Sequence, residues 1–544
     1  MGKKTNKWWL ILMLALSACG HSDLQDGTSS AEAQSQDTKE SAEAIDYTNI
    51  VSNPSEMRAG DILFVGSKGT GNLDFSGVES DATFTLIMGT AAVTQQTQAL
   101  YVSSDEVVEA VESDLVVDLD GEKNLQEEFH DQLRDREIDL AISEQFVEET
   151  ISFGKAVAQP SVLSEGDEQT FRVLSSLTSG TSYTEVTATA DCIGQEVVFF
   201  VDSRVSESVL SQSDIDALCT RFDLVAAREQ ALFGEASDIN KDGKVVVLMT
   251  PQVNKLGGMG GGIITGFFNA ADLMRRSASN PVSNEQEILF IMVPDPAGQY
   301  GTSISRSFAM DNLLPTVLPH ELQHAISYHL HVLKNKGTVE NSCLNEGLSH
   351  LAEDLMGHGQ ENPSRYNLYL RSPSSYPMGE GCSANLATRG GYYLFLRYLY
   401  EQHADGDIFI QRLLDTSLTG SKNIENAFAG SDKDFDSFAE FFMRWQTVLV
   451  LSNSGLTKDV RFNYEERVRN SETDEWGGVS LNGEAEDGRG TVLRGVTGYS
   501  ALSSGTQSLR SGSSKFFRLN SVPESLELDM GSDDQSFGVL IRTE

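Results

Sequence analysis

Residues 318–326 read Leu-Pro-His-Glu-Leu-Gln-His-Ala-Ile and contain the pattern His-Glu-x-x-His. On a helix, His320 and His324 are four positions apart and therefore lie one turn above each other on one face. Two imidazoles in this arrangement can bind one zinc ion. Glu321 stands between them, where it can take a proton from water activated by the metal. The stretch therefore predicts a helix with two metal ligands and a general base, and a third ligand is expected elsewhere.

Proline positions bound the start of this helix. Proline is tolerated in the first turn of a helix and disfavoured in its interior. We therefore expect the helix to begin near Asp311, with a kink at Pro319, or to begin at Pro319 itself. His331 faces the same way as His320, but it lies about 10 Å further along the axis than His324, since a helix rises about 1.5 Å per residue. His331 is thus excluded as a ligand of the same ion.

A second stretch, at positions 344–354, reads Leu-Asn-Glu-Gly-Leu-Ser-His-Leu-Ala-Glu-Asp. The pair of motifs resembles the gluzincin zinc peptidases, and most closely the hyicolysin-like group, over roughly residues 165–450. The resemblance implies that His320, His324 and Glu346 bind zinc and that Glu321 is the general base. His350 is the alternative third ligand, which would give a site of three histidines.

The second motif departs from the thermolysin-like pattern. Those enzymes carry an Asp four residues after the ligand Glu, where it orients a ligand histidine, and here that position is His350. Glu353 or Asp354 could supply the missing carboxylate. The resemblance also implies an oxyanion-stabilising side chain on the next helix, and Tyr392 or Tyr393 is the candidate. Packing in a helix core is the alternative role for either tyrosine.

The N-terminus has the pattern of a targeting segment. Three lysines precede a short apolar run from Trp8 to Leu16, which is too short for an ordinary membrane span. Leu16-Ser17-Ala18-Cys19 resembles the lipobox of bacterial lipoproteins, which implies that Cys19 is lipidated and becomes the mature N-terminus. The alternative is an ordinary secretory signal. The resemblance implies a lipid anchor in the cell envelope, and Gly20 after the cysteine favours the outer membrane.

Four cysteines remain after Cys19. An even number in an exported chain predicts disulfides. Proximity in sequence favours Cys192–Cys219 and Cys343–Cys382, although four cysteines allow three connectivities.

The chain has 544 residues and a formal net charge of −40, from 40 Lys and Arg against 80 Asp and Glu. This charge argues against nucleic-acid binding through phosphates.

The length predicts several domains. Short alternating or apolar runs predict strands at 61–65, 82–87, 98–102, 170–173, 183–190, 196–201, 245–248, 288–293, 491–493, 516–519 and 537–541. Apolar stripes predict helices at 211–233, with Ser213 as N-cap, and at 423–450. The expected organisation is a signal peptide (1–18), a disordered tether (19–46), a β-rich N-terminal domain (47–190), a catalytic domain (191–475) and a small β-rich C-terminal domain (476–544).

Two loops have sequence features of a ligand-binding site. Asp238, Asn240 and Asp242, followed by Gly243, match the first half of an EF-hand calcium loop. The twelfth position is Met249 instead of Glu, so a polar turn before a strand is the alternative to Ca²⁺ binding. The second loop, 257–262, is five-sixths glycine. It is either a plain connection or a flap whose backbone approaches a ligand closely.

These patterns predict an α+β fold with a gluzincin-like catalytic domain between β-rich, sandwich-like domains. The predicted function is a lipid-anchored zinc metallopeptidase that hydrolyses protein or peptide substrates with zinc-activated water and Glu321 as base. The preference for internal peptide bonds rests on the resemblance alone. The alternative is a non-catalytic surface lipoprotein, an adhesin or binding module, that retains the zinc site. A purely structural zinc is a third possibility, although such sites usually have four protein ligands and more sulfur.

Overall fold

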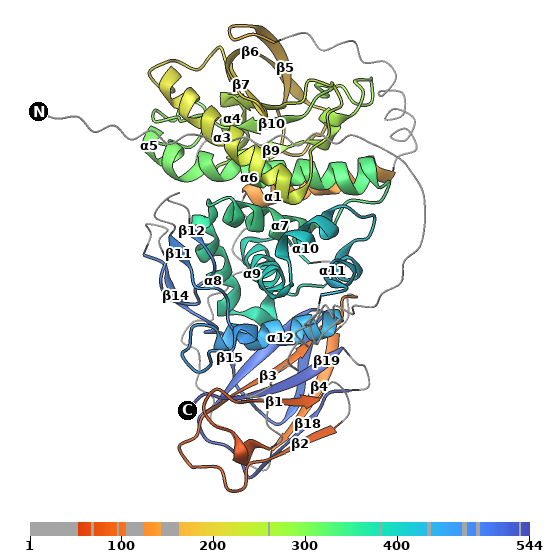
Figure 1. Cartoon of the computed structure of the whole chain (residues 1–544), viewed down its shortest axis with the longest axis vertical. Coiled ribbons are helices and arrows are strands. Elements are labelled where there is room, and N and C mark those ends of the chain that lie inside the picture. The colour runs from red at the N-terminus through yellow and green to blue at the C-terminus, as the bar shows by residue number, and fades with distance from the viewer. Residues whose placement is uncertain are drawn as a thin grey trace, which may run out of the picture. The chain divides into compact units, whose positions relative to one another are not determined.

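The computed structural model describes residues 53–66, 70–94, 97–104, 125–142, 163–258, 262–379, 382–431, 437–469, 476–485, 490–531 and 535–544. The predicted signal peptide, Cys19 and the predicted tether lie outside these ranges. Among the helices within them, none combines the length and the apolar character that a membrane span requires. The fold is mixed α+β, with several sheets and a helical region between them (Figure 1).

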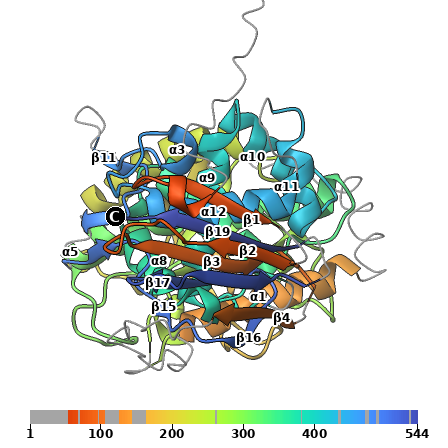
Figure 2. The same cartoon turned by 90° about the horizontal axis from the view of Figure 1, so that it is seen from below.

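Strands from both ends of the chain pair with each other in two sheets. The first has the order β1 (Ile62–Gly66), β19 (Ser536–Arg542), β3 (Phe84–Thr90), β17 (Ser513–Leu519), β15 (Tyr499–Ser500). The second has the order β16 (Gly505–Arg510), β4 (Thr97–Ser104), β18 (Ser525–Asp529), β2 (Thr70–Asp74). Figure 2 shows the early strands alternating with the late ones. The apolar side chains of both sheets share one core, so the terminal strands form a single sandwich.

This pairing differs from the two terminal β domains that the sequence predicted. β3 lies between β17 and β19, with Phe84 opposite both Leu519 and Arg542. Each short strand has an apolar face that must be buried, and a partner from the far end of the chain buries it as well as a neighbour does. Local patterns identify a strand but not its partner, which is why the sequence suggested two domains.

The central sheet lies within the predicted catalytic region. Its order is β5 (Glu168–Leu174), β6 (Tyr183–Ile193), β7 (Val197–Asp202), β8 (Val245–Met249), β10 (Ile288–Ile291), β9 (Gly266–Phe268). β7, β8 and β10 are parallel and fully buried, as their continuous apolar runs predict. β9 is antiparallel to β10 and stands at the edge. The predicted boundary at residue 190 falls inside β6, so β5 and β6 belong to this sheet.

Helices precede, interrupt and follow the strands of this sheet along the chain. The longer ones are α1 (Leu125–Ile142), α3 (Gln212–Phe233), α6 (Leu314–Tyr328), α7 (Ser342–Leu355), α8 (Asn362–Arg371), α9 (Leu386–Gln402), α10 (Gly406–Leu414), α11 (Gly420–Phe428) and α12 (Phe438–Leu451). Of these, α1, α6, α7 and α9 contribute residues to the candidate site. The shorter elements are η1 (Pro54–Glu56), α4 (Pro251–Leu256), η2 (Ala270–Leu273), α5 (Arg306–Phe308), η3 (Ala309–Leu313), η4 (His329–Lys334), η5 (Gly359–Glu361), η6 (Pro373–Ser375), η7 (Val460–Phe462), β11 (Val468–Arg469), β12 (Trp476–Gly477), β13 (Asn482–Glu484) and β14 (Val492–Arg494).

Two helix predictions need correction. The N-cap of α3 is Ser211 and not Ser213, because Ser211 and Asp214 satisfy each other's backbone N–H groups in a capping box. The single helix predicted at 423–450 is two helices, α11 and α12, and Ser437 caps the second one by accepting from Glu440 N. The aromatic residues of α12 remain core, as predicted, and Phe442 contacts Phe537 of the sandwich.

Both predicted disulfides are present. Cys192 of β6 is joined to Cys219 of α3, and Cys343 of α7 is joined to Cys382, which lies shortly before α9. The second bond ties together the two helices that flank the candidate site. Disulfides are typical of proteins outside the cytoplasm, which agrees with the exported character that the N-terminus predicts.

Candidate metal centre

α6 carries the His-Glu-x-x-His pattern in a nearly continuous buried stretch. It begins at Leu314, directly after the π-helical turn η3, so both predicted starting points are off by a few residues. Pro315 lies in the first turn, where its missing N–H costs nothing. Pro319 lies inside the helix, where it cannot bond the carbonyl four residues earlier. His320 and His324 still lie one turn apart, and both are buried.

α7 carries the predicted third ligand. Asn341 caps the helix through its side-chain oxygen, which accepts from Cys343 N and Leu344 N. Glu346 follows in the second turn and is fully buried. Gly347 has a packing role, because a Cβ at this position would lie 2.5 Å from Tyr392 Cβ of α9. Glycine therefore lets α9 lie close to the turn that holds Glu346.

The three predicted ligands face one another. His320 Nε2 lies 3.5 Å from Glu346 Oε2, and His324 Nε2 lies 3.5 Å from Glu346 Oε1. Atoms bound tetrahedrally at about 2.0–2.1 Å from zinc are roughly 3.3–3.5 Å apart, so these separations match a shared ion. His320 Nε2 and Glu346 Oε1 are buried without a hydrogen-bond partner. Such atoms are costly unless something binds them, so the residues fit a metal ion.

A fourth residue joins the cluster that the sequence did not single out. His130 of α1 has a ring nitrogen in the group formed by His320, His324 and Glu346, and all four ligand atoms lie within 4.8 Å of one another. Its Nδ1 is 3.7 Å from Glu346 Oε1. Nothing in the sequence around His130 resembles a ligand motif, since it is a lone histidine in a charged stretch. His130 and His320 are 190 positions apart in the sequence, and only the fold brings them together.

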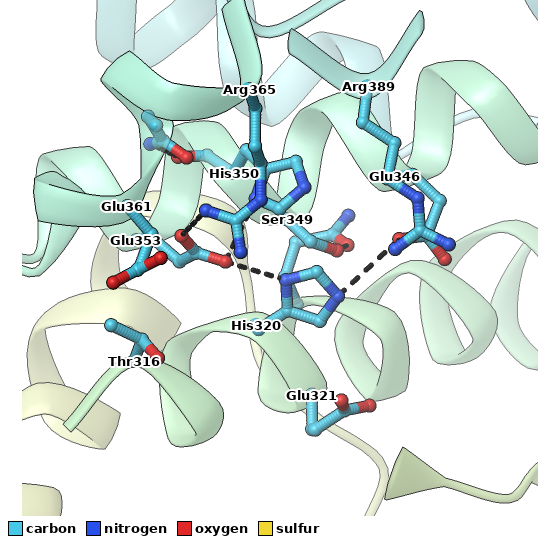
Figure 3. A network of polar contacts seen from close by, with 12 residues as sticks. Thr316, His320, Glu321, Glu346, Ser349, His350, Glu353, Glu361, Arg365 and Arg389 are labelled. Atoms are coloured by element: carbon cyan, nitrogen blue, oxygen red, sulfur yellow. Dashed lines mark hydrogen bonds and ion pairs between the residues drawn. The ribbon is translucent and has the colours of Figure 1, made fainter. Parts of the chain in front are cut away.

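The carboxylate that orients a ligand histidine is Glu353. Its Oε1 lies 2.8 Å from His320 Nδ1 and 2.9 Å from His350 Nδ1, as Figure 3 shows. Burial lowers the pKa of His350 to about 4, so that imidazole is neutral. His350 shares a carboxylate with His320 and belongs to a second buried group, His320, His350 and Glu353, whose ligand atoms also lie within 4.8 Å of one another. Asp354 faces elsewhere, 3.0 Å from Arg397 Nη1.

Electrostatics keep Glu346 ionised. Burial raises the pKa of its carboxyl, but the charge of Arg389 holds it well below its ordinary value. Arg389 Nη1 lies 2.6 Å from Glu346 Oε2, on the α9 side (Figure 3). Burial, with the positive charge of Arg134 adding to it, lowers the pKa of His324 well below its ordinary value. An ionised carboxylate and a neutral imidazole are the forms that bind a metal.

Glu321 is oriented by the edge strand of the central sheet. Its Oε2 accepts a hydrogen bond from Phe268 N of β9 at 2.9 Å. Its Oε1 lies 3.8 Å from His130 Nε2. The carboxylate thus stands beside the cluster with one oxygen held and the other directed towards His130.

The two tyrosine candidates have other surroundings. The Tyr392 hydroxyl donates to Met378 O, and Tyr393 is fully buried and stacks on Tyr366. Burial raises the pKa of the Tyr392 hydroxyl above its ordinary value. Packing accounts for both residues, and a role at the oxyanion stays a prediction. Arg389 is the side chain of α9 that contacts the cluster.

The candidate calcium loop forms a self-contained turn before β8. Asp238 Oδ1 accepts from Gly243 N, and Asp242 Oδ1 accepts from Lys244 N. Asn240 Nδ2 donates to Asp242 Oδ2, and Asn240 Oδ1 accepts from Asp242 N. These contacts are those of a polar turn, and Ca²⁺ binding stays a prediction. Of the glycine-rich loop, positions 259–261 lie outside the described residues, so the flap stays untested.

The comparisons with known proteins leave this assignment to the geometry. No family model matches the chain, and no curated protein matches it. What the structure supports directly is a buried cluster of three histidines and a glutamate that could hold a metal ion, in a mixed α+β fold with two disulfides.

Proposed function

We propose that the protein is a zinc-dependent peptidase. The observation that carries the proposal is the position of Glu321 beside the buried group of His320, His324 and Glu346. A zinc ion, when bound by these residues, supplies the Lewis acidity that makes water a nucleophile near neutral pH. The histidines and the carboxylate match the two-histidine, one-glutamate set of catalytic zinc sites.

Residues of the chain transfer the proton, orient the ligands and balance the charge of the site. Glu321 accepts a proton from the attacking water and passes it to the leaving amine, while Phe268 N keeps its carboxylate in one orientation. Glu353 holds the tautomer of His320 in which Nε2 is free for the metal. Arg389 balances the charge of Glu346 in the buried site. Nη2 of Arg389 is buried without a hydrogen-bond partner, which makes it a candidate donor to an oxyanion in place of the two tyrosines.

The edge strand supports a peptide as the substrate. β9 ends the order of the central sheet and pairs with β10 on one side. An extended peptide can add to such an edge through main-chain hydrogen bonds. A peptide paired with β9 would pass beside Glu321, because Glu321 is bonded to Phe268 of that strand. A peptide that runs along β9 on both sides of Glu321 would be cut within its chain, which supports the proposal of an endopeptidase.

The test uses the full-length chain and an unfolded, alkylated protein substrate. We expect cleavage that 1,10-phenanthroline abolishes and added zinc restores. Glu321→Gln should retain one zinc per chain and lose most turnover, since the amide cannot accept the proton. Measurable turnover that is equal in the wild type and Glu321→Gln would exclude this mechanism.

A second candidate function is a surface lipoprotein with a structural zinc and no catalytic activity. The presence of His130 as a fourth side chain in the cluster favours it, because structural zinc sites have four protein ligands. One zinc per chain, with no turnover by the wild type or by any His130 variant, would support it.

We also propose a lipid anchor at Cys19 in the bacterial envelope. Cys19→Ala should move the protein from the membrane fraction to the soluble fraction.

A further inference from the structure

Helix α1 has an unusual buried face. Its six buried residues are Glu127, Phe129, His130, Leu133, Arg134 and Glu137. Four of these six are polar or charged, and side chains of this kind are seldom fully buried without a partner. A helix that packed on a hydrophobic core would bury an apolar stripe instead. The composition of this face indicates that α1 is complementary to a polar site, and that site is the metal cluster.

His130 is the residue of α1 that reaches furthest into the cluster. Its side chain is fully buried, and neither ring nitrogen has a hydrogen-bond partner. Nδ1 faces Glu346 at 3.7 Å, and Nε2 faces Glu321 at 3.8 Å. The imidazole therefore stands between the proposed base and the proposed ligands. Water and the substrate carbonyl must occupy this same position in a zinc peptidase.

The flanking contacts of α1 hold His130 in place. On one side, Gln126 Nε2 donates to Thr265 Oγ1 at 3.1 Å, and Phe129 makes an edge-to-face contact with Phe267 of β9 at 5.1 Å. On the other side, Glu127 Oε1 accepts from Leu386 N, the first residue of α9. Figure 1 shows α1 between the sheet that contains β9 and the helices α7 and α9.

The same contacts cover the proposed substrate strand. β9 is an edge strand, and yet Gly266, Phe267 and Phe268 are all buried. Phe129 of α1 packs on Phe267, so α1 occupies space beside the strand to which a substrate would pair. The helix that brings His130 to the metal position therefore also contacts the proposed substrate strand.

We propose that α1 is an inhibitory segment that keeps the enzyme latent, with His130 as a fourth metal ligand that closes the site. The proposal rests on the proposed peptidase function. Displacement of α1 opens the metal position and frees β9. The contacts of α1 are side-chain contacts, so they can be broken without unfolding the central sheet.

Full-length wild type and His130→Ala, both loaded with Co²⁺, form the test. The visible spectrum of Co²⁺ reports the number and type of its ligands, and acetohydroxamate is the probe for an open metal position. We expect His130→Ala to retain Co²⁺ and to change its spectrum when acetohydroxamate is added, whereas the wild type does not respond. Cleavage of the unfolded protein by the zinc form should rise ~10- to ~100-fold, as when a rare open state becomes the major one.

Two further variants keep the test informative. Glu128→Ala changes an exposed residue of the same helix and should behave as the wild type. Glu127→Ala keeps His130 but loses the contact with Leu386, so it should respond to acetohydroxamate partially, even if His130→Ala fails to fold. Equal responses of the wild type and His130→Ala would overturn the proposal, and so would loss of Co²⁺ from His130→Ala.

The proposed peptidase function fails separately from this inference. If His130→Ala responds to acetohydroxamate but no variant cleaves protein, the closing role of His130 stands and the peptidase function is rejected. If His130→Ala cleaves faster, then Glu321→Gln introduced into that variant should abolish the gain. A gain that survives Glu321→Gln would reject the role of Glu321 and leave the closure by His130 intact.

Discussion

His320 Nδ1 lies 2.8 Å from Oε1 of Glu353, a residue two helical turns after Glu346 on α7. The bond fixes which imidazole nitrogen faces the cluster. Thermolysin-like sequences place the corresponding carboxylate four residues after the ligand, whereas this chain places it seven residues after. A spacing of seven also returns to the same face of a helix, so Glu353 lies on the face of α7 that carries Glu346.

Glu353→Gln should lower the affinity for zinc roughly 10- to 100-fold, the usual effect of losing a carboxylate that orients a ligand histidine. Competition with a chromogenic chelator measures it. Asp354→Asn is the matched control, because that carboxylate pairs with Arg397 and not with a ligand. It should reduce thermal stability and leave zinc affinity nearly unchanged. Equal zinc affinities of Glu353→Gln and the wild type would contradict the assigned role.

Gly347→Ala should destabilise the protein by about 1–3 kcal/mol, the common range for an overpacked core. The added Cβ would meet Tyr392 Cβ at 2.5 Å and the Tyr392 backbone at 3.1 Å, so α9 must move. Zinc affinity should fall as well, because Glu346 is the adjacent residue. Gly477→Ala, where a Cβ meets nothing within 4 Å, is the control. Thermal unfolding with and without zinc is the measurement, and identical curves for both variants would refute the packing role.

Arg389→Met should affect the metal-free protein more than the zinc-bound protein. Removing one partner of a buried ion pair costs about 3–5 kcal/mol, since the other charge is left uncompensated. Zinc supplies a new positive partner for Glu346, so the loss should shrink when the metal is bound. Unfolding in chelator and in excess zinc measures both states. Arg389→Lys, which keeps the charge, should show a smaller loss in chelator.

Removing the Cys343–Cys382 bond with a double serine substitution should lower both stability and zinc affinity. Either disulfide is expected to contribute about 2–4 kcal/mol, and the two close segments of similar length. Only Cys343–Cys382 ties α7 to the segment before α9. The matched double substitution at Cys192 and Cys219 should therefore lower stability alone. Zinc affinities that fall equally in both variants would contradict this distinction.

Glu229 should make the protein less stable as the pH rises. Both its oxygens are buried without a hydrogen-bond partner, and burial raises the pKa of this carboxyl well above its ordinary value of 4.5. Above pH 4.5 the unfolded chain releases the proton and the folded chain keeps it, so the free energy of unfolding falls with increasing pH. Glu229→Gln should remove this contribution and raise the melting temperature at pH 8 more than at pH 5. The opposite order would show that the carboxylate is stabilised by a charge.

Most of the helices and strands were predictable because their signals are local. The alternating segment at 183–190 is β6, and the apolar runs at 196–201 and 288–293 contain β7 and β10. Spacing within one helix likewise brings His320 and His324 together without reference to the rest of the chain. Because of Pro319, the predicted start of the helix was wrong by a few residues. Tertiary packing tolerates an interior proline that would destabilise an isolated helix.

The sequence by itself determined that His320 and His324 lie one turn apart with Glu321 between them, because this depends on spacing along one helix, and the resemblance of the second motif indicated Glu346. The tertiary structure alone decided which strands share the terminal sandwich, which carboxylate orients His320, and that His130 enters the cluster. These relationships join residues far apart in the chain. The spacing of apolar residues in a segment indicates a helix or a strand, but it does not specify the distant surface that buries the segment.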